Sequence, residues 1–416
     1  MNTNSFDTKK YNLILSVIFL SLFVTIRFET GFVLIRPFDL ICLIVFPFVL
    51  LLRGRQEEIS KGFFYLLPFL IIHILSASIV GINNLIRELL QILIILVFAF
   101  TLSTFKTRID CQKTFNISFL GSLIILFAVI WWHYSIGIWA RGLKQLPDSK
   151  AIFTIITILT FIYIIFFKKI KINDLVILLF ILLPILLLSG ERKALLIFIF
   201  LLVLKYSPGF SIKTVFMLFL IYFFLIILSV IIENPYFYEK INTTLNIMQT
   251  GNLNYFLSTG LMSENDTISN LQRVFSFRVS KEYFIDNPIF GVGTNNYKIM
   301  VFEQYPQLVE YRSGALTHGI HGEFQRVLVE NGLIGLIAYF MIWYKSWHRS
   351  KIILNEVLQF GKINKTQLNF CLYGIYLSLA LFVGTEASTT KSFVFLAIIA
   401  LLPDYYTYHY SLKKNN

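Results

Sequence analysis

The chain has 416 residues, of which 56% are hydrophobic and 14% are charged, and its formal net charge is +13. Soluble domains carry about 25% charged residues, so this composition excludes an ordinary soluble protein and indicates one that crosses the membrane several times. The positive charge does not call for nucleic acid as a partner, because the cytoplasmic loops of membrane proteins are rich in lysine and arginine. The spacing of the three cysteines and six histidines predicts neither a metal site nor a disulfide framework.

Twelve apolar segments approach the roughly 20 residues that a helix needs to cross the hydrocarbon core. They lie near residues 11–28, 38–53, 63–80, 85–104, 115–134, 151–168, 172–189, 193–206, 212–232, 332–348, 369–386 and 390–410. We therefore expect an all-α polytopic membrane protein with three parts. Residues 1–232 would hold helices one to nine, residues 233–331 one large loop with short helices, and residues 332–416 the last three helices.

The basic residues predict the orientation of these spans. If both termini are cytoplasmic, the inner loops contain mostly lysines, as the positive-inside rule requires. Nine arginines then fall on the outer side: Arg27, Arg36, Arg87, Arg141, Arg192, Arg273, Arg278, Arg312 and Arg326. Pairing with a nearby carboxylate, as between Arg87 and Glu88, is one explanation. Binding of an anion is the other, because a guanidinium holds phosphate or carboxylate through two parallel hydrogen bonds.

The loop at 233–331 is too long for a simple connector and is expected to be functional. Within it, Val274–Ile285 has apolar residues at helical spacing, and the run Asn287–Gly293 (NPIFGVG) predicts a turn with apolar anchors. Its tyrosines, among them Tyr297 and Tyr305, fit either stacking on sugars or a place at the membrane interface.

The candidate site lies where this loop ends. Residues 316–335 contain two histidines, two glutamates and an arginine just before an apolar segment, and His321–Gly332 predicts a short helix that leads into the tenth span. A histidine here can accept a proton near neutral pH, and His321 is preferred to His318. A second polar insertion, Ser189–Lys193, contains Arg192, which must be paired or functional if it lies below the membrane surface.

Three of these elements together resemble the O-antigen polymerase and O-antigen ligase superfamily. They are Ser189–Arg192, then Arg273 followed by the turn Asn287–Gly293, and then His321 followed by an apolar helix with Glu330, Gly332 and Gly335. Two positions differ from the family pattern. Gly322 stands where an asparagine is common, and Phe277 stands where a tryptophan is common.

The resemblance implies a GT-C-like glycosyltransferase in the bacterial cytoplasmic (inner) membrane, acting at its outer face without a metal or other cofactor. Its substrates would be glycans on undecaprenyl diphosphate, and membrane lipid would surround it. His321 would take the acceptor proton, while Arg192 and Arg273 would hold the diphosphate. Further contacts to the diphosphate or glycan would come from Arg278, Arg312, His318, Glu323, Arg326 and Glu330.

Three functions remain open from the sequence. An O-antigen polymerase is favoured over a ligase that transfers glycan to lipid A–core, because polymerases tend to be as rich in Ile, Phe, Lys and Asn as this chain. A chain-length regulator protein is considered as a further partner. A polysaccharide transporter or flippase is the third reading, and it predicts charged residues in the middle of broken membrane helices. The spans look nearly free of charge in their middles, which favours an enzyme at the membrane surface.

Overall fold

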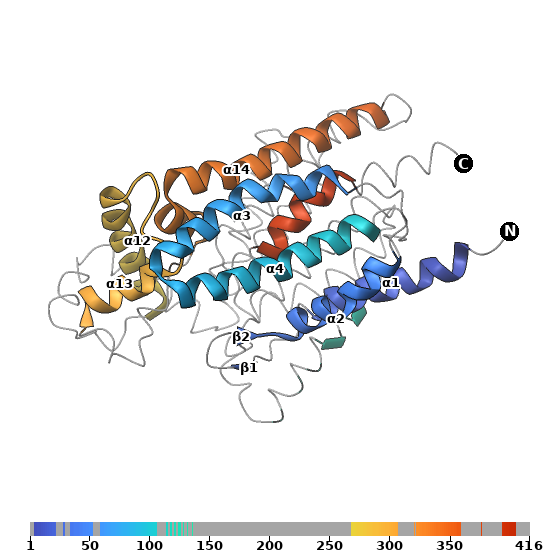
Figure 1. Cartoon of the computed structure of the whole chain (residues 1–416), viewed down its shortest axis with the longest axis horizontal. Helices are drawn as coiled ribbons and strands as arrows, with labels where there is room; N and C mark the ends of the chain where they lie inside the picture. The colour runs from blue at the N-terminus through green and yellow to red at the C-terminus, as the bar shows by residue number, and fades with distance from the viewer. Residues whose placement is uncertain are drawn as a thin grey trace, which may run out of the picture.

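The computed structural model describes residues 4–21, 28–29, 34–52, 59–105, 268–306, 322–358 and 393–404, with isolated residues between 114 and 135 and residues 320 and 376. These parts are helical apart from one hairpin of two short strands (Figure 1).

The first four helices are α1 (Asn4–Ser21), α2 (Pro37–Leu52), α3 (Lys61–Val80) and α4 (Ile82–Phe105). They confirm the second, third and fourth predicted apolar helices closely. The first was predicted too far along the chain, because Phe28 lies in strand β1 (Phe28–Glu29), which pairs antiparallel with β2 (Leu34–Ile35). Apart from this short hairpin, the described elements confirm the all-α prediction. The hairpin had no signal in the sequence, because each strand has only two residues.

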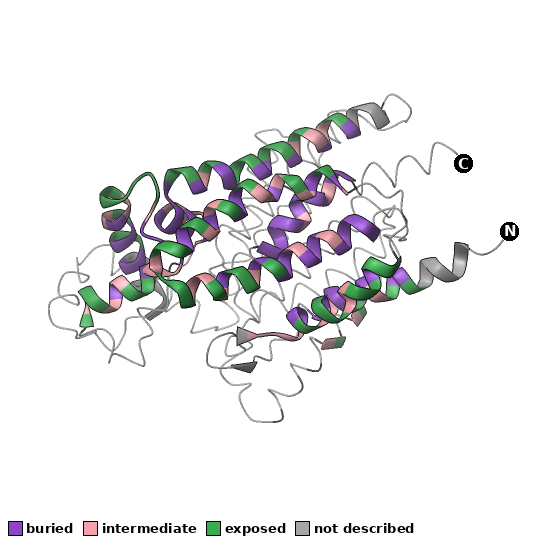
Figure 2. Cartoon of the chain, viewed as in Figure 1, coloured by how far each residue is buried: buried purple, intermediate pink, exposed green. Residues whose placement is uncertain are grey.

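The helices pack in the order α1, α2, α4, α3, with α14 (Glu323–Leu358) on the far side of α3. Aromatic side chains fill the centre: the Phe69 ring lies 5.1 Å from Tyr339 in α14 and 5.8 Å from Phe393. Phe393 begins a further helix, Phe393–Asp404, which is almost wholly buried (Figure 2). At the start of α3, a Cβ on Gly62 would collide with the backbone of Ala400, so the glycine permits this close approach.

The helix α14 is sharply bent at Gly332, whose backbone is non-helical (φ 66°, ψ −168°). Ring centroids of Phe324 and Tyr339 are only 5.8 Å apart. In a straight helix, 15 residues would separate them by about 22 Å. The first part of α14, Glu323–Asn331, therefore folds back along the second part. This confirms the short helix predicted before the tenth apolar segment.

Among the described residues, three helices are long and apolar enough to cross a membrane: Lys61–Val80, Ile82–Phe105 and Glu323–Ile353. Exposed residues alternate with buried ones along them (Figure 2), as expected for helices that face lipid on one side. The chain is thus a multi-pass membrane protein. The predicted spans between residues 151 and 232 lie outside the described residues, as do most of 115–134 and 369–386.

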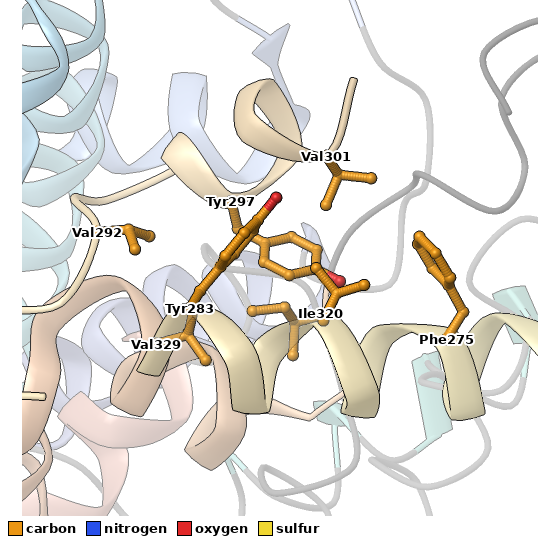
Figure 3. Close-up of a cluster of buried hydrophobic side chains, with 8 residues drawn as sticks. Phe275, Tyr283, Val292, Tyr297, Val301, Ile320 and Val329 are labelled. Atoms are coloured by element: carbon orange, nitrogen blue, oxygen red, sulfur yellow. The ribbon is translucent and has the colours of Figure 1, made fainter. Parts of the chain in front are cut away.

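Two further helices, α12 (Ile268–Asp286) and α13 (Asn296–Gln304), lie against α14. The predicted helix at Val274–Ile285 is confirmed. Side chains from the three helices point toward one another and form a separate small core (Figure 3). Its buried members are Phe275, Val279, Tyr283, Val292, Tyr297, Val301, Ile320 and Val329. We call residues 268–306 the polar module, because they lie outside the spanning helices.

Candidate functional site

The turn Asn287–Gly293 docks onto the bend of α14. Backbone N–H groups of Val292 and Gly293 donate to the carbonyls of Val329 and Glu330, at 2.9 and 3.0 Å. In the other direction, Leu333 N–H donates to Pro288 O at 2.9 Å, and Ile334 N–H donates to Ile289 O at 3.3 Å. A helix end leaves such groups without intrahelical partners. The turn supplies partners to both halves of the bent helix at once.

Two glycines permit this contact. Gly291 has φ 72°, and a Cβ there would lie 2.5 Å from the backbone of Glu330 and Gly332. A Cβ on Gly332 would collide with the carbonyl of Ile289. One glycine of each motif, Gly291 and Gly332, is therefore explained by one backbone-to-backbone contact at positive φ. Motifs that lie about 40 residues apart in the sequence form a single structural unit.

An ion triad lies within the short first part of α14. The Arg326 guanidinium donates to both carboxylate oxygens of Glu323, at 2.9 and 2.6 Å, and through Nη1 to Glu330 Oε2 at 2.9 Å. All three side chains are buried. The bidentate geometry matches what a guanidinium offers a carboxylate. The two glutamates stand three residues before and four after the arginine, so one helix face presents the whole triad.

A second buried group joins α3, α4 and the polar module. His73 Nε2 and Glu88 Oε2 are 3.0 Å apart, and Asn295 Nδ2 donates to Glu88 Oε1 at 2.6 Å. Asn295 adopts a left-handed backbone conformation (φ 62°), which asparagine tolerates better than most residues. Next to it, Thr294 Oγ1 donates to His73 O at 3.2 Å and accepts from Asn331 Nδ2 at 2.9 Å.

Polar side chains at the ends of α3 and α4 complete this junction. Asn84 Nδ2 donates to Thr294 O at 2.8 Å, and Ser76 Oγ donates to Glu330 O at 2.7 Å. The expected pairing of Arg87 with Glu88 is confirmed, with Nε 3.5 Å from Oε1. We call these groups the buried polar junction: Ser76, His73, Asn84, Glu88, Thr294, Asn295, Glu323, Arg326, Glu330 and Asn331. It connects the polar module to three spanning helices.

The junction contains three predicted site residues, Glu323, Arg326 and Glu330, and each carboxylate is bound to the arginine. Arg278 lies elsewhere, on the exposed side of α12, with Nε 3.5 Å from Glu282 Oε1. Arg273 belongs to the same helix, one turn before Phe277.

Four predicted site residues lie outside the described residues: Arg192, Arg312, His318 and His321. The neighbours of His321 are described. Ile320 belongs to the core of the polar module, and the Gly322 carbonyl accepts from Arg326 N–H at 2.8 Å. Gly322 is thus the N-cap of α14, a position where asparagine and glycine are both accepted. The departure from the family pattern at Gly322 therefore changes the helix cap by a few tenths of a kcal/mol.

Sequence reasoning missed His73, Thr294 and Asn295, and it named Glu88 only as a partner of Arg87. The signal for His73 was present, because an ionisable residue within an apolar span is by itself a functional candidate. His73 in α3 is fully buried, and it is an ionisable exception to the interpretation that the spans are nearly free of charge in their middles. In the described ranges, no three histidine, cysteine, aspartate or glutamate side chains are placed to hold a metal ion.

The tyrosines of the polar module have a different role from either of those expected. Tyr297 is buried in the core, where its ring packs 5.8 Å from that of Tyr283, and Tyr305 packs on Phe275 at 5.4 Å. Burial raises the pKa of Tyr297 to about 12. Neither sugar stacking nor interface anchoring describes Tyr297, which stabilises the core of the module.

The described helices and the junction define a multi-pass membrane protein with a folded polar module fixed to its spanning helices. Residues 175–340 match the model of the O-antigen ligase family, so this part of the chain is a domain of that family and the resemblance is confirmed. Proteins of this family are membrane enzymes that transfer lipid-linked glycans. The matched range includes the module, the turn and the bend of α14. No curated protein matches the chain.

Proposed function

We propose that the chain is an O-antigen polymerase, which joins repeat units carried on undecaprenyl diphosphate at the outer face of the cytoplasmic membrane. The match over residues 175–340 supports glycan transfer. The observation that carries the proposal is the docking of Asn287–Gly293 on Gly332. This contact joins the helix that bears Arg273 to the helix that follows His321, so the two proposed catalytic segments are held on one scaffold.

In the proposed reaction, a hydroxyl oxygen of one repeat unit attacks the anomeric carbon of another. The bond from that carbon to the diphosphate oxygen breaks, and undecaprenyl diphosphate leaves. His321 takes the proton of the attacking hydroxyl, while Arg192 and Arg273 bind the diphosphate as negative charge develops on it. A general base contributes roughly 10²–10⁴ in rate, and one preorganised donor to developing charge contributes roughly 10²–10³.

The buried triad of Glu323, Arg326 and Glu330 stabilises the helix that follows His321. Because Arg326 already binds Glu323 and Glu330 in a buried setting, we assign these three residues to positioning the helix after His321. Arg278, Arg312 and His318 remain the proposed contacts to the diphosphate or glycan. In this proposal both termini are cytoplasmic and the polar module faces outward. A chain-length regulator remains a proposed partner.

A ligase is the second candidate, and the description of the matched family favours it. Deletion of the gene distinguishes the two activities. A strain without the polymerase retains lipid A–core with a single repeat unit, which is the expected result. Bare core together with lipid-linked polymer would instead establish a ligase. Bare core without any glycan at the outer face would establish a transporter. A transporter predicts ionisable residues within membrane helices, and the buried His73 in α3 is such a residue.

A further inference from the structure

One side of the polar module exposes large apolar side chains. In α12, Phe275, Val279 and Tyr283 point into the module core. On its other side, Phe277 is 67% exposed and Ile285 is 63% exposed. The turn that follows adds Ile289 at 55% and Phe290 at 66%. Four large exposed apolar side chains on one helix and the turn after it indicate a contact with another molecule or with a membrane.

This surface continues directly into the lipid-facing side of α14. The backbone hydrogen bonds from Leu333 and Ile334 to Pro288 and Ile289 hold the turn against the start of the spanning part of the helix. There, Leu333, Ile334 and Ile337 are exposed. Exposed apolar side chains on a spanning helix face lipid, so the turn lies at the level where α14 enters the bilayer.

The basic side chains on α12 fit the same environment. Lys281 is exposed and lies between Phe277 and Ile285, four residues from each, so the three side chains form one row along the helix. Arg278 follows Phe277 and pairs with Glu282 at 3.5 Å. A helix that lies in a membrane interface combines apolar side chains with basic ones, which extend to the phosphates of the head groups.

We propose that α12 and its following turn lie in the interface of the bilayer. We call Phe277, Lys281, Ile285, Ile289 and Phe290 the lipid-contact surface. Its four apolar side chains insert among the upper acyl carbons, and Lys281 binds phospholipid phosphate. A second copy of the chain would cover the apolar side chains equally well, but it would not explain their continuity with the lipid-facing side of α14.

This placement also assigns a position to the substrate, a step that rests on the proposed function. Arg273 stands one turn before Phe277 in α12, and residues at this spacing share a helix face. A helix at the depth of the head groups therefore places the backbone of residue 273 near the level of the lipid phosphates. The diphosphate of a lipid-linked donor lies at the same level. The lipid-contact surface thus sets residue 273, which is proposed to bind the diphosphate, at the depth at which the lipid-linked substrate diffuses.

Spin labels measure this depth directly. The chain has three cysteines, so the test begins with a Cys42→Ala, Cys111→Ala, Cys371→Ala background in lipid nanodiscs. Single cysteines are then placed by Phe277→Cys, Ile285→Cys and Phe290→Cys and labelled. Ile337→Cys on α14 is the lipid control, and Glu303→Cys, exposed on α13, is the water control. Power saturation compares collisions with oxygen, which concentrates in lipid, and with a water-soluble nickel chelate.

We expect labels at 277, 285 and 290 to collide mainly with oxygen, as at 337, and the label at 303 to collide mainly with nickel. Nickel-dominated collisions at 277 and 290 would overturn the proposal. Low collision rates with both reagents, together with broadening between labels on two copies, would overturn it in favour of a dimer contact. Three labelled positions guard against misfolding of any one variant. The measurement does not depend on activity, so failure of the polymerase assay and failure of the lipid contact are separate results.

Discussion

Gly332 and Ile289 are in direct backbone contact, so closely that a Cβ on Gly332 would collide with the Ile289 carbonyl. The contact joins the turn after α12 to the bend of α14, and it lies between the proposed catalytic segments at Arg273 and His321. Its neighbours are equally constrained, since Gly291 meets the backbone of Glu330 and Gly332.

We expect Gly332→Ala to separate the turn from α14, lowering both the melting temperature and the glycan-transfer activity. The matched control is Gly81→Ala. Gly81 has a similar glycine-type backbone (φ 134°, ψ 167°) but open space around its Cβ position. Both variants carry the backbone strain of about 1–3 kcal/mol, and only Gly332→Ala adds the collision. Equal losses of melting temperature and activity in the two variants would show that the contact has no role of its own.

Removal of the arginine from the triad leaves two buried carboxylates without their partner. Arg326→Gln is therefore expected to destabilise the protein by about 3–5 kcal/mol, the usual cost of breaking a buried ion pair from one side. The triple variant Glu323→Gln, Arg326→Met, Glu330→Gln removes all the charge and should recover much of this loss. Thermal unfolding in detergent measures both. A fully stable Arg326→Gln protein would mean that the triad is hydrated.

The hydrogen bond from Asn295 to Glu88 is expected to couple the polar module to α4. Hydrogen bonds to charged groups contribute about 1.5–3 kcal/mol. A double-mutant cycle with Glu88→Gln and Asn295→Ala, read by thermal unfolding, should give a coupling free energy in that range. Strictly additive effects of the two changes would place the residues outside contact. Glu282→Gln is a control, because its carboxylate is half-exposed and pairs with Arg278 in the same helix.

Local features were predictable from sequence spacing, and long-range contacts were not. The helix at Val274–Ile285 and the turn at Asn287–Gly293 follow from apolar periodicity and from proline and glycine. The contact between residues 289 and 332 depends on how two segments fold together, which no local pattern encodes. The same holds for His73 and Glu88, which face each other only because Gly81 reverses the chain between α3 and α4.

An arginine in a motif can bind the substrate, or it can pair with carboxylates of the protein itself. Arg326 does the second. From the sequence, Arg326 was one of nine outer arginines and a predicted ligand of the substrate. In the structure its guanidinium is occupied by Glu323 and Glu330. An arginine three residues after one glutamate and four before another on a helix is expected to pair with both. Arg273 has no such spacing, so the sequence alone distinguishes Arg326 from Arg273.

Arg273 is proposed to bind the diphosphate through its guanidinium fork. Arg273→Lys keeps the charge and loses bidentate binding, so we expect a fall in rate of roughly 10²-fold, the size of one lost preorganised donor. Arg349→Lys is the control, because Arg349 pairs with Asp404 and has no proposed contact with the substrate. It should change the rate little. Similar large losses in both variants would contradict a specific role of Arg273 in diphosphate binding.

The central claim is that this chain joins lipid-linked repeat units, with His321 as the base. The most direct measurement incubates the purified protein in detergent with its undecaprenyl-diphosphate-linked repeat unit and separates the products by length. The account predicts a ladder of polymer for the native chain and none for a folded His321→Ala variant. A ladder formed at the native rate by His321→Ala would contradict the assignment of the base. If the folded native chain formed no ladder but transferred the glycan to lipid A–core, the polymerase proposal would be wrong.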